Sequence, residues 1–585
     1  MSIGKYRRLG ICSFSAIMEI DMKIETVRHS LAHILAASVQ ELYPGTKFGI
    51  GPAIENGFYY DFDLLKAISP EDLPKIEKKM RDLLKQNIPF QKKIIAKAEA
   101  KALFKNQPYK LELIKDQQTG VYESGKFIDL CKGPHIKSTK EIPLDGFKLT
   151  RIAGAYWKGS EKNPMLTRIY GVAFDSKKEL DDYLKLQQEA EKRDHRKLGE
   201  TLDLFSFHSV APATPFWHPK GMVIVNELQN YIRKLQREMG YLETSTPILV
   251  KKELYEISGH WEHYQENIFP LKIENEAFAL KPMNCPESTY IYSSKIRSYK
   301  DLPLRLAEFG YLHRKEKTGV LTGLFRAYGF IQDDAHIYCQ PDKIFDEITN
   351  VLKLLTKIHK DFNLKTSFAF ATKPDKAMGD PKLWKKAENS LEFALKKNKL
   401  EYEMHPKDGA FYGPKLDVDV EDSLGRKWTI ATIQLDFQIP ERFNLFYIDQ
   451  KGKKQRPVII HRSSIGSFER FIGILLEHYA GALPFWLSPV QIWVIPIGSR
   501  HEKYAQKVSE ELKDFRVEIK NENETVSKKI RAGEMQKIPF MLVVGDEEMK
   551  TESIRARERG KGDLGMIKLN KFIEKCQNYL NQPKT

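Results

Sequence analysis

Cysteine is scarce in this chain and its spacing is irregular. The 585 residues include five cysteines, at positions 12, 131, 285, 339 and 576. An odd number, scattered so widely, argues against a disulfide framework and for a reducing compartment, so we expect a cytoplasmic protein. The chain also has no run of about 18 apolar residues, so no membrane span is expected. Residues 1–22 are basic and then mildly apolar without a clear cleavage site, and we interpret them as a tail and not a signal peptide.

Acidic residues are outnumbered. Lys and Arg total 94 against 78 Asp and Glu, which leaves a net charge of +16 and a pI of about 9.2. Such a surplus suits a polyanionic partner such as nucleic acid, although a generally lysine-rich composition would produce the same balance. The apolar content of 41% is ordinary for a globular protein. The length predicts roughly three to four domains.

The stretch 281–336 holds the first group of chemically useful residues. Cys285 and His336 are too far apart in sequence for a local zinc finger, so they can share a metal only if the fold brings them together with a third ligand. His461 is the candidate for that ligand. Within the same stretch, Arg314 and Arg326 bracket a glycine-bearing loop, and the planar guanidinium matches the oxygens of a phosphate.

The N-terminal quarter holds two further pairs of potential ligands or acid–base groups. A helix is expected from Thr26 to about residue 42, and it would place His29 and His33 on one face because they are four residues apart. Cys131 and His135 have the same spacing, but an intervening Gly-Pro places them on a turn. Taken without context, the four residues are equally compatible with unrelated core and surface positions.

Periodicity outlines the rest of the chain. Charged amphipathic helices are predicted at 70–86 and 96–105, and an Asn-Gly turn at 56–57 predicts a hairpin. The charged stretch 178–200 is predicted to be one connecting helix. Residues 487–585 alternate strand-like and helix-like runs, which predicts a parallel or mixed sheet covered by helices.

Together these motifs resemble the class II aminoacyl-tRNA synthetases and, within that class, the threonyl-tRNA synthetases. The segments 282–286, 332–336 and 466–470 carry the resemblance most specifically, and it extends from about residue 23 to the C-terminus. It implies a multidomain α/β and α+β protein of the bacterial type, without room for the small ubiquitin-like N-terminal domain common in the family. The implied parts are an α+β editing domain (23–177), the connecting helix (178–200), a catalytic core on an antiparallel sheet (201–486) and an α/β anticodon-binding domain (487–585).

The resemblance also implies an activity and its residues. The protein would activate threonine with ATP and transfer it to tRNA(Thr), using one Zn²⁺ per chain and Mg²⁺ with ATP. Arg314 would hold the α-phosphate and Arg470 the γ-phosphate, while His260 would accept or position a proton or, alternatively, pack beside Trp261. Zinc would be bound by Cys285, His336 and His461. Further contacts to substrate or ATP are expected from Glu316, Arg326, Phe330, Gln332, Asp334, Tyr412, Lys415 and Gln434.

Threonine is difficult to distinguish from valine and serine, and this difficulty gives a reason for an editing site in the N-terminal quarter. An apolar pocket separates threonine from isosteric valine by no more than about a hundredfold, whereas a metal with open positions can read the hydroxyl directly. Serine carries the same amine and hydroxyl, so a second site that hydrolyses seryl-tRNA becomes necessary. The resemblance places this editing site at His29, His33, Cys131 and His135, surrounded by Tyr60, Lys110 and Asp129. Water would be activated there by side chains, without a second metal.

Two partners complete the expectation. Arg555, Arg557 and Arg559 alternate along a predicted strand, either as a track for tRNA or as the charged, solvated edge of a sheet. The segment 227–247 resembles motif 1 of the class, which implies a homodimer.

Some residues depart from the family pattern, and other functions are compatible with parts of the sequence. Residues 287–289 and Tyr328 differ from what the family commonly has beside Cys285 and in motif 2. A non-catalytic RNA-binding paralogue is the first alternative, but the intact Arg314 and Arg470 argue against it. A prolyl- or seryl-tRNA synthetase is the second, but such enzymes lack the editing residues together with the three zinc ligands.

Overall fold

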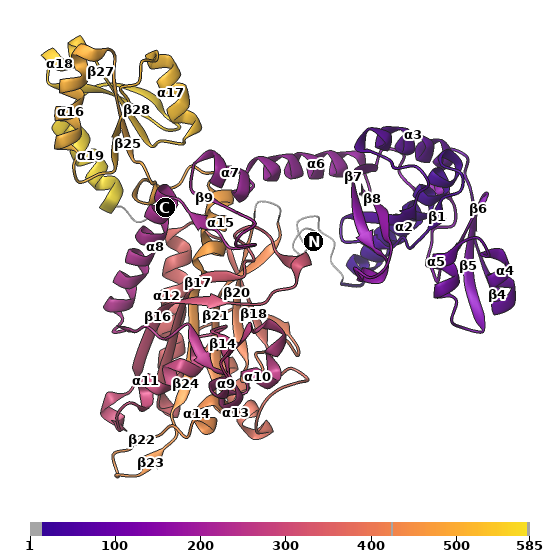
Figure 1. Cartoon of the computed structure of the whole chain (residues 1–585), viewed down its shortest axis with the longest axis horizontal. Coiled ribbons are helices and arrows are strands. Elements are labelled where there is room, and N and C mark those ends of the chain that lie inside the picture. Colours follow the sequence, from indigo (N-terminus) through magenta and orange to yellow (C-terminus); the bar gives the residue numbers. More distant parts are fainter. Residues whose placement is uncertain (1–13, 423–424, 582–585) are drawn as a thin grey trace. The chain divides into compact units, whose positions relative to one another are not determined.

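The computed structural model describes residues 14–422 and 425–581, which divide between two compact units, Met1–Gln188 and Glu189–Thr585. Figure 1 labels their elements along the chain. Of the predicted tail, residues 1–13 lie outside the described residues. Residues 14–22 belong to the first helix, α2 (Phe14–Leu42), so this helix begins well before the expected start at Thr26. Among the described residues, no helix is long and apolar enough to cross a bilayer.

Helix α2 packs against an antiparallel sheet in the first unit. Leu31 and Leu35 on the helix and Tyr60 and Ile169 on the sheet are fully buried in one core. The strand order is β1-β3-β8-β7, with β2 paired to β3, so the predicted hairpin is present; its two turn residues are 55–56, and Gly57 already belongs to β3. The strands are β1 (Lys47–Phe48), β2 (Ala53–Ile54), β3 (Gly57–Asp63), β7 (Phe147–Tyr156) and β8 (Met165–Ala173).

A second, three-stranded sheet delivers the remaining editing residues to α2. Its order is β4-β5-β6, and Cys131 follows directly after β6. The two predicted charged helices are present as α3 and α4. The elements are α3 (Leu73–Leu84), β4 (Phe90–Ala96), α4 (Lys97–Leu103), α5 (Pro108–Leu113), β5 (Gln118–Ser124) and β6 (Phe127–Leu130).

The connecting segment is two helices, where one was predicted. Helix α6 (Lys177–Lys192) ends before α7 (His195–Thr201) begins. The side chain of Asp194 accepts a hydrogen bond from the backbone N–H of Arg196 and so caps a new helix. Aspartate is a favoured N-cap, and this explains the break within a uniformly charged run.

The catalytic unit is built on an eight-stranded sheet, as the resemblance implies. Its order is β11-β16-β17-β24-β21-β20-β18-β19, and only the two edge pairings are parallel. Figure 1 shows its long strands running side by side through the second unit. The strands are β11 (Leu242–Glu243), β16 (Leu304–His313), β17 (Gly329–Cys339), β18 (Thr366–Ala371), β19 (Glu403–His405), β20 (Lys415–Glu421), β21 (Lys427–Asp436) and β24 (Val458–Ser467).

Two segments singled out in the sequence lie at the ends of the long strands. Arg314 and Arg326, which were expected to bracket a loop, both lie in the connection between β16 and β17. Residues 466–470 span the junction between β24 and α15 (Phe468–His478), which starts immediately after β24 with Ser467 as its cap. The other main helices of the unit are α8 (Pro219–Glu238), α9 (Lys252–Ser258), α10 (His260–His263), α11 (Cys285–Ser293), α12 (Ile344–Asp361), α13 (Pro381–Lys397) and α14 (Gln438–Arg442).

The C-terminal region forms the predicted mixed sheet. Three parallel strands are followed by two antiparallel ones in the order β26-β25-β27-β28-β29. The elements are β25 (Ile492–Pro496), α16 (Glu502–Glu511), β26 (Val517–Ile519), α17 (Val526–Met535), β27 (Phe540–Val544), α18 (Asp546–Lys550), β28 (Ser553–Glu558), β29 (Gly562–Lys568) and α19 (Leu569–Asn581).

Candidate functional site

A cavity of about 760 Å³, open to solvent, lies over the middle of the eight-stranded sheet. The connection after β16, the strands β20, β21 and β24 and the start of α15 form its walls. Eight of the residues expected to contact substrate or ATP line it: Arg314, Glu316, Arg326, Phe330, Gln332, Lys415, Gln434 and Arg470.

Three guanidinium groups meet in this cavity. Arg470 donates from Nε to the carbonyl of Phe325 at 2.9 Å and from Nη1 to that of Thr429 at 3.1 Å. Burial lowers the pKa of Arg470 to about 10, and the positive charges of Arg314 and Arg326 add to the effect. Among these three, Arg326 has a carboxylate nearby, at 3.4 Å in Glu316. Concentrated positive charge in a half-closed pocket favours a ligand with several negative charges.

A second cluster lies on the same strands next to the cavity, since Gln434, which lines the cavity, is directly opposite His461 in register. His336 on β17 and His461 on β24 are directly opposite in register, with ring centroids 4.9 Å apart. Cys285, the first residue of α11, is buried beside them. One ligand atom from each of the three lies within 4.8 Å of the others. The fold therefore brings together three donors that are 51 and 125 residues apart along the chain.

The surroundings of this cluster suit a metal. Asp436, fully buried, lies 3.0 Å from Nε2 of His461 through its Oδ2, so Nδ1 is the nitrogen left to bind. A carboxylate that orients a ligating histidine is a common outer partner in zinc sites. Burial raises the pKa of the Cys285 thiol well above its usual range and lowers that of His336 to about 4. A neutral imidazole is the form that binds a metal, and a cation would itself favour the thiolate. The donor set thus fits Zn²⁺.

The cluster and the cavity are linked by side chains. The ring of Tyr412 lies 4.8 Å from that of His461, and its hydroxyl donates to Gln434, which lines the cavity. Asp334 is buried and accepts a hydrogen bond from Asn284 at 3.0 Å. The expected substrate residues that do not line the cavity therefore lie beside the Cys-His-His cluster.

His260 is placed differently from a residue that faces ATP. It is fully buried, its Nε2 lies 3.3 Å from the Cys285 thiol, and its Nδ1 lies 2.9 Å from the Ser258 hydroxyl. Burial lowers its pKa to about 3, helped by the nearby His461 and Arg314. The imidazole is therefore neutral, and it lies beside the cluster of Cys285, His336 and His461.

The residues that depart from the family pattern have local partners. Glu287 accepts a hydrogen bond from the hydroxyl of Tyr255 at 2.7 Å, and Ser288 shares one with Tyr338 at 2.7 Å. These two hydrogen bonds anchor α11 to Tyr255 and Tyr338, and the Cys285 thiol at the start of the helix lies close to His260.

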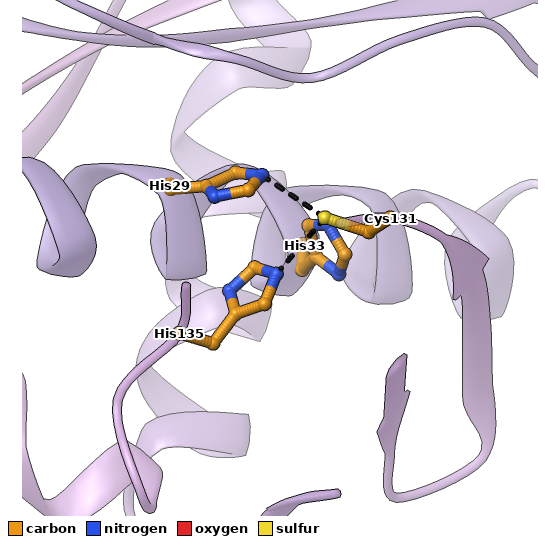
Figure 2. Close-up of side chains that lie close together, drawn as sticks. All are labelled: His29, His33, Cys131 and His135. Carbon is orange, nitrogen blue, oxygen red and sulfur yellow. Dashed lines mark hydrogen bonds between the residues drawn. The ribbon is translucent and has the colours of Figure 1, made fainter. Parts of the chain in front are cut away.

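In the first unit, the four expected editing residues also converge. Figure 2 shows His29 and His33 projecting from one helix toward Cys131 and His135 on the opposing loop. The Cys131 sulfur lies 3.3 Å from Nε2 of His29 and 3.3 Å from Nε2 of His135. Burial raises the pKa of the Cys131 thiol to about 11 and lowers that of His135 to about 2. The group therefore consists of a neutral thiol and neutral imidazoles, which suits acid–base work on a bound water.

The three surrounding residues form a buried network against the histidines. Asp129 accepts a hydrogen bond from the Tyr60 hydroxyl at 2.6 Å and forms an ion pair with Lys110, which also donates to Tyr60 at 2.9 Å. Asp129 lies 3.6 Å from Nε2 of His33. A charge pair with further hydrogen bonds is the form in which buried ions persist, so this network gives the site a rigid wall.

The three arginines proposed for tRNA do not form one row. Arg555, exposed, pairs with Asp563 at 2.8 Å, and a bulge separates it from Arg557 in the ladder. Arg559 lies beyond the end of β28, and its guanidinium donates to the carbonyls of residues 482, 483 and 537. Arg555 and Arg557 are two residues apart on β28 and pair regularly with Val543 and Met541 of β27, so they lie on one face as predicted, because the extra residue of the bulge is in β29. Arg559 is instead engaged with backbone.

Sequence reasoning missed several supporting residues. Asp436, two residues after the expected substrate contact Gln434, received no role, and Ser30, between the two histidines of α2, was not singled out. His195 also had no role, yet its ring contacts Glu477 at 2.8 Å and accepts from the Leu324 N–H at 3.1 Å beside the cavity. Each acts through a contact with a residue distant in sequence, and no local pattern marks such a contact.

Comparison with known proteins agrees with this geometry. Three family models match: tRNA synthetase class II core domain (G, H, P, S and T) at residues 269–479, anticodon binding domain at 491–579, and threonyl and alanyl tRNA synthetase second additional domain at 119–170. A threonine–tRNA ligase of Carboxydothermus hydrogenoformans is 50% identical over 95% of this chain and 89% of its own length. One of Thermotoga petrophila is 49% identical, with shares of 95% and 88%. The solved RNA binding domain of threonyl-tRNA synthetase from Cryptosporidium parvum Iowa II is 40% identical, with a TM-score of 0.64, and the match covers 66% of this chain and 98% of that one. The chain belongs to the threonine–tRNA ligase family.

Proposed function

We propose that this protein activates threonine with ATP, transfers it to tRNA(Thr), and hydrolyses seryl-tRNA formed in error. The observation that carries the proposal is the link between two sites on one sheet. A cavity lined by three arginines is joined through Gln434 and Tyr412 to the Cys285, His336 and His461 cluster. A triphosphate and a small amino acid with a hydroxyl would fit these sites side by side.

The cavity would hold ATP. In the activation step, a carboxylate oxygen of threonine attacks the α-phosphorus. The bond from this phosphorus to the oxygen that bridges to the β-phosphate breaks, and pyrophosphate leaves with the electron pair. Arg314 would hold the α-phosphate and Arg470 the γ-phosphate, and their charges would stabilise the charge that develops during displacement. Phe330 lies 5.1 Å from the Arg314 guanidinium, which suits stacking of the adenine. Mg²⁺ would accompany the ATP phosphates.

The cluster would select threonine. Cys285, His336 and His461 would hold Zn²⁺, which, when bound, supplies open positions for the amine and hydroxyl of the substrate. Asp334 is placed to accept from the amino group, and Asn284, which donates to its Oδ2, orients that carboxylate. Tyr412 and Gln434 close the space between the amino acid and the nucleotide. Valine lacks the hydroxyl and would leave polar groups of the site unpaired. An unpaired polar group in a buried site costs binding free energy, so valine would bind more weakly than threonine.

The first unit would perform editing. One polar side-chain atom from each of His29, His33, Cys131 and His135 lies within 4.8 Å of the others, and the buried charge pair of Lys110 and Asp129 lies beside His33. Hydrolysis there would remove serine, which the metal cannot distinguish from threonine by its functional groups.

Two macromolecular partners are proposed from surface residues: tRNA and a second copy of this chain. We propose that Arg555 and Arg557 contribute to tRNA binding and that Arg559 stabilises the surrounding backbone. We also propose a homodimer through the motif 1 region, where Leu242, Ile248 and Leu249 expose between 42% and 57% of their surface. The described cysteines are free thiols, which fits the reducing cytoplasm.

One pair of assays tests the proposal. ATP–pyrophosphate exchange should be strong with threonine, weaker with serine and weakest with valine, and the protein should clear preformed seryl-tRNA. Exchange that proceeds equally well with valine, or that does not depend on threonine, would contradict the synthetic half. Stable seryl-tRNA in the presence of the protein would contradict the editing half.

A further inference from the structure

Ser30 lies on α2 between the two histidines of the editing cluster, and its side chain is fully buried. The hydroxyl donates to the Thr26 carbonyl one turn earlier at 2.8 Å. Its oxygen lies 3.0 Å from Nδ1 of His135 and accepts from the Ile136 N–H at 3.2 Å. A carbonyl can only accept, so the single hydroxyl proton is committed to Thr26 and the oxygen can only accept from His135.

This pattern determines the tautomer of His135. Because the Ser30 oxygen faces Nδ1 as an acceptor, Nδ1 carries the ring proton and Nε2 carries a lone pair. His29 is set in the same way, since its Nδ1 lies 3.1 Å from the Pro134 carbonyl. These tautomers are assigned from the hydrogen-bond network. Both Nε2 lone pairs point at the Cys131 sulfur (Figure 2).

The cluster has fewer protons to donate than lone pairs to accept them. Cys131 also accepts from the Gly133 N–H at 3.3 Å, and its neutral thiol has one proton to donate. Only one of the two imidazole lone pairs can receive that proton. The other is a base without a proton donor from this cluster, on a half-buried imidazole, so its partner during the reaction would be a water or a substrate hydroxyl.

We propose that Ser30 is a positioning residue for seryl-tRNA hydrolysis: it holds His135 in the Nδ1–H tautomer and so keeps the Nε2 lone pair directed into the editing site. This inference rests on the proposed editing function and extends it by one residue. It assigns Ser30 no contact with the substrate.

The step that this arrangement serves is ester hydrolysis. The water oxygen bonds to the carbonyl carbon of the seryl ester while a water proton passes to the open Nε2. The bond between that carbon and the ribose oxygen then breaks, and the ribose oxygen leaves with a proton returned from the imidazolium or the thiol. The products are serine and tRNA, and no further reactant is needed.

The test uses Ser30→Ala in the full chain, with Ser38→Ala as its matched control. Ser38 lies on the same helix, is equally buried, and makes the same bond to a carbonyl one turn earlier, at 2.8 Å to Ile34. This hydrogen bond does not involve a histidine. Ser30→Ala should slow hydrolysis of preformed seryl-tRNA about tenfold, the factor that one hydrogen bond is typically worth. Ser38→Ala should leave the rate near wild type, and both should keep threonine-dependent exchange.

Nitrogen NMR of the imidazole rings supplies the readout that a packing role would not change. In the wild type, His135 should show a protonated Nδ1 and a bare Nε2, and in Ser30→Ala the Nε2–H tautomer should appear. A wild-type His135 protonated at Nε2 would overturn the inference, even if the variant failed to fold. Equal losses in Ser30→Ala and Ser38→Ala would also overturn it.

The variant His135→Ala distinguishes a failure of the proposed role of Ser30 from a failure of the proposed editing function. If His135→Ala clears seryl-tRNA normally, the editing assignment itself is wrong. If His135→Ala abolishes clearance while Ser30→Ala retains the wild-type rate, the editing assignment survives and only the role of Ser30 is refuted.

Discussion

Replacing Asp436 with asparagine tests how far the proposed zinc site of Cys285, His336 and His461 depends on a residue that would not itself bind the metal. Oδ1 of Asp436 accepts from the backbone N–H groups of Gln438 at 2.6 Å and Ile439 at 3.0 Å, and Oδ2 faces Nε2 of His461 at 3.0 Å. In Asp436→Asn the amide oxygen must stay with the two backbone donors. The amide NH₂ would then face His461, where two donors cannot pair.

The expected consequence is a change of tautomer. To accept from the new NH₂, His461 must carry its proton on Nδ1, the nitrogen left to bind a metal. Loss of such an outer partner typically costs about 10–100-fold in metal affinity, or roughly 1.4–2.7 kcal/mol. A hydrogen bond to a charged group is worth about 1.5–3 kcal/mol, which agrees with that range. Because Asp436 is fully buried, solvent does not weaken the effect.

The assay is competition for zinc against a chelator, with the threonine KM for exchange measured beside it. Asp361→Asn is the control, because Asp361 is also a buried carboxylate but pairs with Tyr231 and Lys357. We expect zinc affinity to fall 10–100-fold in Asp436→Asn and to stay unchanged in Asp361→Asn. Wild-type zinc affinity in Asp436→Asn would refute the role of Asp436, and equal losses in both variants would reduce it to a general effect of buried carboxylates.

Four further predictions concern separate parts of the molecule. Cys285→Ser replaces a thiolate with a poor ligand, so zinc content and threonine activation should collapse while the melting temperature changes little; normal activation in a zinc-free preparation would contradict this. His29→Ala or His33→Ala should leave threonine activation intact and let seryl-tRNA accumulate, and clearance at the wild-type rate would refute the assignment. Reversing the charge of Arg555 and Arg557 should raise the tRNA KM and weaken its salt dependence, with exchange unchanged; an unaltered KM would leave these residues as a solvated edge. Burial raises the pKa of Glu469 to about 8, so the folded state binds this proton more tightly than the unfolded state, and the resulting stability is lost as pH rises from about 4.5 through 8. Glu469→Gln should therefore gain thermal stability over the wild type across that pH window, and a constant difference between pH 5 and 8 would show that the carboxyl does not titrate there.

Much of the architecture could be predicted because it depends on local patterns. The spacing of apolar residues predicted the helices α3 and α4, and the Asn-Gly pair predicted the turn between β2 and β3. The predictions that failed involve competition between local signals. Asp194 caps a new helix within a charged run that favours helix throughout, and β28 ends at Glu558, so Arg559 does not continue the row of Arg555 and Arg557.

The sequence by itself determined the family, the class of each domain and the residue types of both sites, because short segments such as 282–286 and 332–336 retain their spacing. Only the tertiary structure decided which residues support them. Strand register sets His461 opposite His336, and the end of β21 brings Asp436 to its ring. The packing of α2 against the loop after β6 brings Ser30 to His135, 105 residues away. Such contacts depend on burial and on hydrogen bonds between distant segments, and the spacing of residues along a chain does not encode where those segments meet.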